Sequence, residues 1–269
     1  MTACPNMDQT LEQTDGVALT REQIDSFHAE GFLRFGKLLD DTEVEALRQE
    51  YDHEFDLARA GKSEMSNLSV DQTDDDEAMV QAETQMLQIM NVTRRNLRFR
   101  KLVYDSRLLD IVATLIGPNI QLYSDQALFK PAHTGGPIHW HQDNAYWKCV
   151  PANIVSCWLT LDDVDDRNGA MNLIPGSHLT PLSHGRAEGS NVLLDAGDQV
   201  DAATAVVVEL AAGGIMFHHC QTLHSTKPNA SGRQRRAFAI HFMTPGTKSL
   251  HDSQYIPVSF NNPLLRARV

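Results

Sequence analysis

The stretch His139-Trp140-His141-Gln142-Asp143 follows the turn-forming residues Thr134-Gly135-Gly136-Pro137 and decides how the second half of the chain is interpreted. Side chains two residues apart in a β-strand point to the same face. We therefore expect His141 and Asp143 to reach one metal ion from the same side. A His-x-Asp pair is common by chance, so a metal site requires a further ligand.

A third ligand is available far downstream at His224, just beyond the strand-like residues 214–218. Two histidines and one carboxylate on one face, with open positions opposite, are typical of non-heme Fe(II) oxygenases. Zinc hydrolases or isomerases use the same ligand types. A zinc site, however, gives no reason for Arg235, which follows His224 by eleven residues at the start of another apolar stretch.

The composition favours one soluble, intracellular domain. The 269 residues are 42% hydrophobic, which suffices for a sizeable core, and the net charge is −12. So acidic a chain is unsuited to non-specific binding of nucleic acid or anionic membranes. The four cysteines form no CxxC pair, and residues 1–15 do not resemble a signal peptide. We therefore expect a cytoplasmic protein with a small-molecule partner, and make no prediction of oligomeric state.

The pattern of elements changes near residue 118. Thr20 and Gln23 have the spacing of a capping box, and Asp41 or Thr42 is expected to cap a second helix. Residues 94–116 read as a further helix that ends before Gly117. After it come short apolar or alternating stretches at 120–129, 138–141, 154–161, 170–174, 205–210, 215–218 and 237–243. This pattern predicts a mainly β fold, in which a mostly helical part (1–118) packs on an antiparallel β-barrel core (119–269).

Two polar segments in the first half have alternative interpretations. Residues 61–83 are rich in acidic side chains and read as a solvated loop or as a mobile lid over a site. The basic residues between 94 and 101 read as a solvated helix face or as an anion site.

The chain resembles the phytanoyl-CoA dioxygenase-like family of Fe(II)/2-oxoglutarate-dependent oxygenases from about residue 19 to residue 243. The opening residues 19–32 look like the family's first helix and strand. Its middle signature is matched by residues 158–163, Asn168-Gly169-Ala170-Met171 and residues 174–178. The final signature is matched by His224-Ser225-Thr226, Asn229-Ala230-Ser231 and Arg235-Arg236-Ala237.

This resemblance implies a single oxygenase domain (1–269) with a double-stranded β-helix core, also called a jelly roll or cupin-like fold. It also implies that His141, Asp143 and His224 hold the catalytic Fe(II). By the family's spacing, Arg235 pairs with the distal carboxylate of 2-oxoglutarate, because a guanidinium binds a carboxylate through two parallel hydrogen bonds. Arg233 and Arg236 are the nearby competitors for this role.

Further site residues are weaker candidates. Thr226 shares the strand face of His224 and is expected to add a hydroxyl to the cosubstrate carboxylate. Trp158 is expected to line the cosubstrate pocket or to pack in the core, and Gln126 is a candidate polar contact. His139, Tyr146 and Trp147 are candidates for the substrate pocket. The neighbours His218, His219 and Cys220 point alternately on a strand, so they are not expected to form a second metal site.

The resemblance implies a dioxygenase that consumes O2 and 2-oxoglutarate, releases succinate and CO2, and oxidises a small molecule. The intact carboxylate at Asp143 favours hydroxylation, because related halogenases have a small residue at that position. Desaturation, epoxidation and ring formation remain open. The alternatives are an acyl-CoA hydroxylase, whose CoA phosphates would meet the basic group at 94–101, and a non-catalytic sensor of metal or 2-oxoglutarate.

Overall fold

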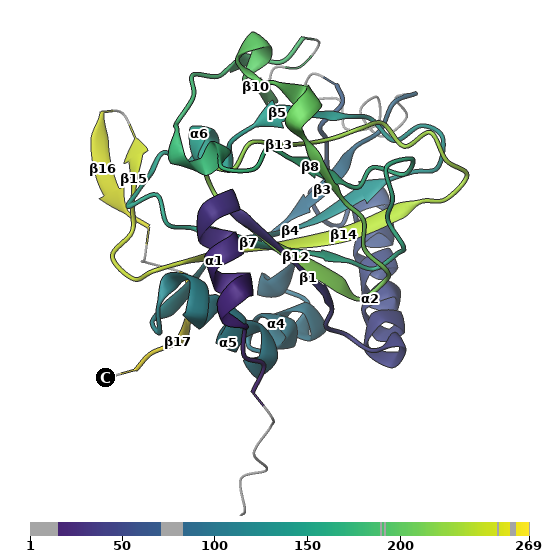
Figure 1. Ribbon diagram of the computed structural model, residues 1–269. Coiled ribbons are helices and arrows are strands. Elements are labelled where there is room, and N and C mark those ends of the chain that lie inside the picture. The colour runs from purple at the N-terminus through teal and green to yellow at the C-terminus, as the bar shows by residue number, and fades with distance from the viewer. Residues whose placement is uncertain are drawn as a thin grey trace, which may run out of the picture.

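A computed structural model describes residues 16–70, 83–188, 190, 192–251, 253–258 and 262–268. Two antiparallel sheets face each other, and helices cover the outer face of the larger sheet (Figure 1). The predicted fold class, a mainly β jelly roll with N-terminal helices, is confirmed. Most of the segment interpreted as a lid, residues 71–82, lies outside the described residues.

The first two helices begin at capping boxes. Thr20 and Gln23 exchange side-chain to backbone hydrogen bonds at the start of α1 (Arg21–Glu30), as predicted. Helix α2 (Asp41–Arg59) is capped by Asp40, so the prediction of Asp41 or Thr42 was wrong. The reason is Glu43, which lies three residues after Asp40 and returns a hydrogen bond to its backbone N–H.

The single helix predicted over residues 94–116 is three shorter elements. A 3₁₀ turn, η1 (Val92–Arg94), precedes α4 (Leu97–Val103) and α5 (Ser106–Ile116). The helices are separate because Asn96 and Asp105 are N-caps, whose side chains accept hydrogen bonds from the first backbone N–H groups of α4 and α5. Strands β1 (Phe32–Lys37), β2 (Ser66–Asn67) and β3 (Leu87–Met90) also lie in this half of the chain.

The larger sheet supplies one wall of the molecule. In spatial order its strands are β1 (Phe32–Lys37), β12 (Gly214–His219), β7 (Val155–Thr160), β14 (Arg235–Met243), β4 (Ile120–Lys130), β3 (Leu87–Met90) and β2 (Ser66–Asn67), with β17 (Leu264–Arg266) also paired to β4. All of these pairs are antiparallel.

The smaller sheet supplies the opposite wall, in the order β11 (Val206–Val208), β8 (Met171–Leu173), β13 (His224–Thr226) and β5 (Ile138–His141). The remaining elements are α6 (Asp143–Trp147), the sheet of β16 (Gln254–Pro257), β15 (Lys248–His251) and β6 (Cys149–Val150), the pair β10 (Leu194–Asp195) and β9 (Gly185–Arg186), and the 3₁₀ turns η2 (Ser177–Leu179), η3 (Gly197–Gln199) and η4 (Ala202–Thr204). Within the described ranges, no helix is long and apolar enough to cross a membrane.

The strand alternation of the larger sheet divides the interior in two. On β14, Phe238 and Ile240 pack with the helices in the main hydrophobic core. Ala237 and Ala239 point the other way, towards the smaller sheet, where they share a second core with Trp158 of β7. Because alanine side chains are short, this inner face leaves room between the two sheets.

Candidate active site

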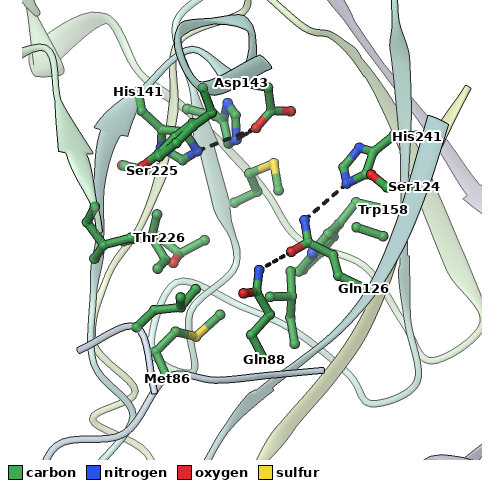
Figure 2. Close-up of a pocket in the computed structure, with 18 of the residues that line it drawn as sticks. Met86, Gln88, Ser124, Gln126, His141, Asp143, Trp158, Ser225, Thr226 and His241 are labelled. Carbon is green, nitrogen blue, oxygen red and sulfur yellow. Dashed lines mark hydrogen bonds and ion pairs between the residues drawn. The ribbon is translucent and has the colours of Figure 1, made fainter. Parts of the chain in front are cut away.

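A cavity of about 420 Å³ opens between the two sheets, within the range of small-molecule sites. Figure 2 shows side chains from both walls pointing into it. The lining residues include the predicted site residues His141, Asp143, Tyr146, Trp147, Trp158, Gln126, His224, Thr226 and Arg235. The sequence-based candidates therefore meet in one place, with the exception of His139.

His141 and His224 lie side by side on neighbouring strands of the smaller sheet. They are register partners on β5 and β13, and their ring centroids lie 4.1 Å apart. The Nδ1 of His141 donates to the carbonyl of His139 at 2.8 Å, and the Nδ1 of His224 donates to the carbonyl of Thr222 at 2.9 Å. Because a carbonyl only accepts, each ring carries its proton on Nδ1 and presents the lone pair of Nε2.

Asp143 reaches the same point from a different element than expected. Strand β5 ends at His141, and Asp143 is the first residue of α6, so the two are not neighbours on one strand. Gln142 between them is extended, with φ −107° and ψ 127°, which preserves the alternation that the strand argument assumed. The side-chain amide of Gln142 donates to the carbonyl of Gln221 at 2.7 Å, which ties this turn to the segment before His224.

The three side chains form a compact set of ligand atoms. Asp143 Oδ1 lies 3.6 Å from the Nε2 of His141 and 3.6 Å from the Nε2 of His224. One ligand atom from each residue lies within 4.8 Å of the others, and all three residues are buried. Such a set of two imidazoles and a carboxylate is able to hold a metal ion.

The protonation states suit a metal. Burial and the neighbouring His141 hold the pKa of His224 well below its ordinary value, so its Nε2 stays unprotonated. Burial alone would raise the pKa of Asp143. The hydrogen bond that His218 donates to Oδ2 opposes burial, and the pKa of Asp143 lies below its ordinary value. Asp143 is therefore an ionised ligand.

The second carboxylate oxygen of Asp143 is held by the larger sheet. His218 donates from Nε2 to Oδ2 at 3.1 Å, and the Ser156 hydroxyl lies 3.3 Å from the same oxygen. Ser156 Oγ in turn accepts from His241 Nδ1 at 2.7 Å. The sequence singled out neither Ser156 nor His241, and His218 was considered only as part of a second metal site.

Arg235 is a buried cation in the same cavity. Its side chain is 1% exposed, and its guanidinium carbon lies 5.6 Å from the centroid of the Trp158 ring. Among the described residues, no carboxylate lies within ion-pair distance of it, and its Nε has no hydrogen-bond partner. Burial lowers the pKa of Arg235 to about 10, so it remains charged at neutral pH. A buried charge of this kind requires a counter-charge.

The competing arginines are committed elsewhere. Arg236 contacts Asp162 at 2.8 Å and Asp52 at 2.8 Å, and Arg233 contacts Asp165 at 2.5 Å. Arg235 is thus the arginine of this segment that is available to a ligand in the cavity.

A second buried basic side chain lies beside Arg235. Lys130 is the register partner of Arg235 across β4 and β14, and it is fully buried. Its Nζ donates to Thr226 Oγ1 at 2.7 Å and to the Lys227 carbonyl at 2.6 Å. Burial, followed by the nearby charge of Arg235, holds the pKa of Lys130 well below its ordinary value. Since Lys130 donates to Thr226 Oγ1, the hydroxyl proton of Thr226 is directed elsewhere.

The remaining candidates differ in their surroundings. Trp158 both lines the cavity and packs in the inner core, and its Nε1 has no partner among the described residues. Gln126 lines the cavity, where it accepts from Gln88 and donates to His241 Nε2 at 3.0 Å. Figure 2 shows Gln88, Gln126 and His241 in a line.

Tyr146 and Trp147 of α6 also line the cavity. The Tyr146 ring stands edge-on to His141 at 5.6 Å, and its hydroxyl accepts from the Leu194 backbone at 2.7 Å. His139 is outside the described lining; its Nδ1 lies 3.7 Å from Asp195. A role of His139 in substrate binding stays a prediction.

Comparison with known proteins decides the family. The family model for phytanoyl-CoA dioxygenase matches residues 27–237, most of the chain.

The chain belongs to the phytanoyl-CoA dioxygenase family. This confirms the resemblance of its sequence motifs and, at the level of the family, the predicted Fe(II)- and 2-oxoglutarate-dependent dioxygenase class.

Curated relatives of this dioxygenase have low to moderate identity. A phytanoyl-CoA dioxygenase of Arabidopsis thaliana is 22% identical over 92% of this chain and 97% of its own length. An ectoine dioxygenase of Halomonas elongata is 27% identical over 86% of the chain and 71% of its own length. A probable alpha-ketoglutarate-dependent hypophosphite dioxygenase of Stutzerimonas stutzeri is 29% identical over 52% of the chain, which spans about half (51%) of that relative's length.

Solved structures agree on the fold. EvdO2 of Micromonospora carbonacea var. aurantiaca, solved with 2-oxoglutarate, is 25% identical with a TM-score of 0.64, over 88% of this chain and 95% of the other. The non-heme alpha ketoglutarate dependent carbocyclase SnoK has a TM-score of 0.72 at 24% identity, over 91% of this chain and 96% of the other.

Proposed function

We propose that this dioxygenase binds Fe(II) through the Nε2 atoms of His141 and His224 and the Oδ1 of Asp143. The observation that carries the proposal is the convergence of these three atoms in a buried cavity, while the other polar atom of each side chain is held by the protein. Two imidazoles and one carboxylate with open positions suit Fe(II). When bound, the iron supplies O2 activation, coupled to conversion of 2-oxoglutarate into succinate and CO2.

The cosubstrate end of the cavity is proposed to be the side with Arg235. Among the described residues, its guanidinium has a free Nε, and its Nη2 donates only to the sulfur of Met86 at 3.5 Å, so it is able to supply the counter-charge for a carboxylate of 2-oxoglutarate. Thr226 adds a hydroxyl donor, because Lys130 occupies an acceptor site of its oxygen. Trp158 forms a wall and offers its free indole N–H, and Gln126 is the weaker polar contact.

The substrate is proposed to be a small, uncharged and largely apolar organic molecule that is hydroxylated. Apart from the imidazoles, Asp143 and Arg235 are the only charged side chains among the described residues of the lining, and both have other roles. The rest of the lining is mainly aliphatic, sulfur-containing or aromatic: Leu68, Met86, Met90, Leu128, Ile138, Val192, Leu193, Tyr146 and Trp147. Such a lining binds apolar surface and disfavours ions.

An acyl-CoA substrate is less well supported. A CoA ester needs cations for its phosphates, and the basic residues at 94–101 lie outside the described lining of the cavity. Within this group, Arg95 pairs with Glu54 at 2.7 Å, and Arg100 donates to the Thr93 carbonyl at 2.8 Å. The net charge of −12 also favours a small molecule over nucleic acid or membrane partners.

Turnover distinguishes the enzyme from a sensor. Apoprotein is loaded anaerobically with Fe(II) and 2-oxoglutarate, O2 is admitted, and succinate is measured with and without a panel of neutral and anionic small molecules. We expect O2-dependent succinate formation that neutral, apolar compounds stimulate, and no succinate from Asp143→Ala. Binding of Fe(II) and 2-oxoglutarate without turnover under any condition would favour the sensor.

A further inference from the structure

We infer that Ser156, His218 and His241 are positioning residues that hold Asp143 with only one oxygen facing the metal. This inference rests on the proposed metal site. It assigns a function to a polar row of the larger sheet that belongs to neither the three ligands nor the cosubstrate contacts.

The row is built by strand register. His218 of β12 pairs with Ser156 of β7, and Ser156 pairs with His241 of β14. Directly paired residues of antiparallel strands point to the same face, so the three side chains stand side by side on the inner face. All three are nearly inaccessible: Ser156 is 0% exposed, and His218 and His241 are each 2% exposed. A buried polar row in a jelly-roll core is costly unless its hydrogen bonds are satisfied.

The hydrogen bonds of the row run in one direction, towards Asp143. Gln126 donates to the Nε2 of His241, which fixes the proton of this imidazole on Nδ1. His241 Nδ1 then donates to Ser156 Oγ, which leaves the Ser156 proton to be donated to Asp143 Oδ2. Burial lowers the pKa of His241 to about 4, so the ring is neutral, as this direction requires.

Two donors on one oxygen determine how Asp143 meets the ion. His218 and Ser156 both donate to Oδ2, while Oδ1 faces the Nε2 atoms of His141 and His224. A carboxylate in this state offers one oxygen to a metal, because the other is already engaged. With one ligand atom from each of the three residues, an ion held here would keep positions open for 2-oxoglutarate and O2.

The test uses Co(II), titrated into purified, metal-free full-length protein, with the dissociation constant and the visible absorption spectrum as readouts. Ser156→Ala removes a donor to Oδ2. Ser231→Ala is the matched control, because Ser231 is also buried and donates to Asn229 Oδ1 in the turn between β13 and β14, away from the cavity lining. We expect Ser156→Ala to weaken Co(II) binding about tenfold and to change the spectrum, and Ser231→Ala to leave both at wild-type values.

A second pair of variants separates the hydrogen bond from packing at His241. In His241→Asn the amide nitrogen takes the place of Nδ1 and can still donate to Ser156. In His241→Gln the amide lies near the position of Nε2, so the contact with Gln126 is kept and the donation to Ser156 is lost. We expect His241→Asn to bind Co(II) within about twofold of wild type, and His241→Gln to show the spectrum and the roughly tenfold loss of Ser156→Ala.

The outcomes separate the inference from the proposed site. Wild-type affinity and spectrum in Ser156→Ala and His241→Gln would overturn the inference, and so would an equal loss in Ser231→Ala or equal behaviour of the two His241 variants. Asp143→Ala is titrated in parallel. If Asp143→Ala binds Co(II) as wild type does, the proposed metal site itself fails.

Discussion

The imidazoles of His141 and His224 are paired across neighbouring antiparallel strands, and each is fixed by a carbonyl two residues earlier in its own chain segment. Both rings thus present Nε2 to the same point before any ion arrives, and Asp143 Oδ1 completes the set. A preorganised set of three ligands loses most of its affinity for a metal ion when one of them is removed.

His224→Ala and Asp143→Ala are each expected to abolish iron-dependent consumption of 2-oxoglutarate. Each removes one of the three ligands, and the two that remain bind the ion much more weakly. The control is His53→Ala, at an exposed position of α2, which should keep wild-type consumption. Iron-dependent consumption of 2-oxoglutarate by either ligand variant would contradict the ligand assignment.

Replacement of Arg235 by Met should separate stability from cosubstrate binding. A buried guanidinium without a counter-charge destabilises the folded state, so Arg235→Met is expected to unfold at an equal or higher urea concentration than wild type when neither carries a ligand. In the presence of Ni(II), 2-oxoglutarate at about 100 times its own Kd should stabilise wild type by about 2.7 kcal/mol. It should stabilise the variant by much less. Equal stabilisation of both proteins would show that Arg235 does not bind the cosubstrate.

Lys130→Met is expected to raise the KM for 2-oxoglutarate about 2- to 10-fold, the value of one hydrogen bond, with little change in metal affinity. The reason is the contact of Lys130 Nζ with Thr226 Oγ1, which leaves the hydroxyl proton for the cosubstrate. Lys227→Met serves as the control, since Lys227 pairs with Asp166 and is half exposed. An unchanged KM in Lys130→Met would show that the hydrogen bond from Lys130 does not orient the Thr226 hydroxyl towards the cosubstrate.

Acidification should destabilise the metal-free protein partly through His219. Burial, with a contribution from the neighbouring His178, lowers the pKa of His219 to about 4, whereas an unfolded histidine titrates near 6.5. The unfolded state therefore binds more protons between about pH 6.5 and pH 4. The stability linked to His219 is complete above about pH 6.5 and decreases as the pH falls through this window.

The measurement is urea unfolding at pH 7 and pH 5. In His219→Asn the amide oxygen can accept the Gln221 N–H that His219 Nδ1 accepts. The loss of stability between the two pH values should be smaller than in wild type by on the order of 1–2 kcal/mol. A loss equal to that of wild type would exclude His219 as a source of the pH dependence.

The sequence predicted those parts of the site that lie in local motifs. His141 and Asp143 are close neighbours in sequence, and His224 and Arg235 have the family's spacing, so local motifs together with the family resemblance selected them. The strands at 120–129 and 138–141 were also recognised, because alternation and turn residues are local signals.

The residues that the sequence did not predict depend on strand register. Ser156, His218 and His241 come from three strands and meet only because β7 lies between β12 and β14 in a particular register. Lys130 meets Thr226 for a similar reason, since it lies opposite Arg235 at the end of β4. Neither register nor strand order can be read from single-chain periodicity, and a buried Lys or Ser carries no local signal.

We propose that His141, Asp143 and His224 hold the iron while Arg235 holds 2-oxoglutarate in the same cavity. The most direct test is a crystal structure of the protein grown without oxygen in the presence of Fe(II) and 2-oxoglutarate. We expect one ion bonded to the two Nε2 atoms and to Oδ1 of Asp143, with a cosubstrate carboxylate paired to the Arg235 guanidinium. An ion bound by other residues, or a cosubstrate carboxylate paired to another cation, would contradict it.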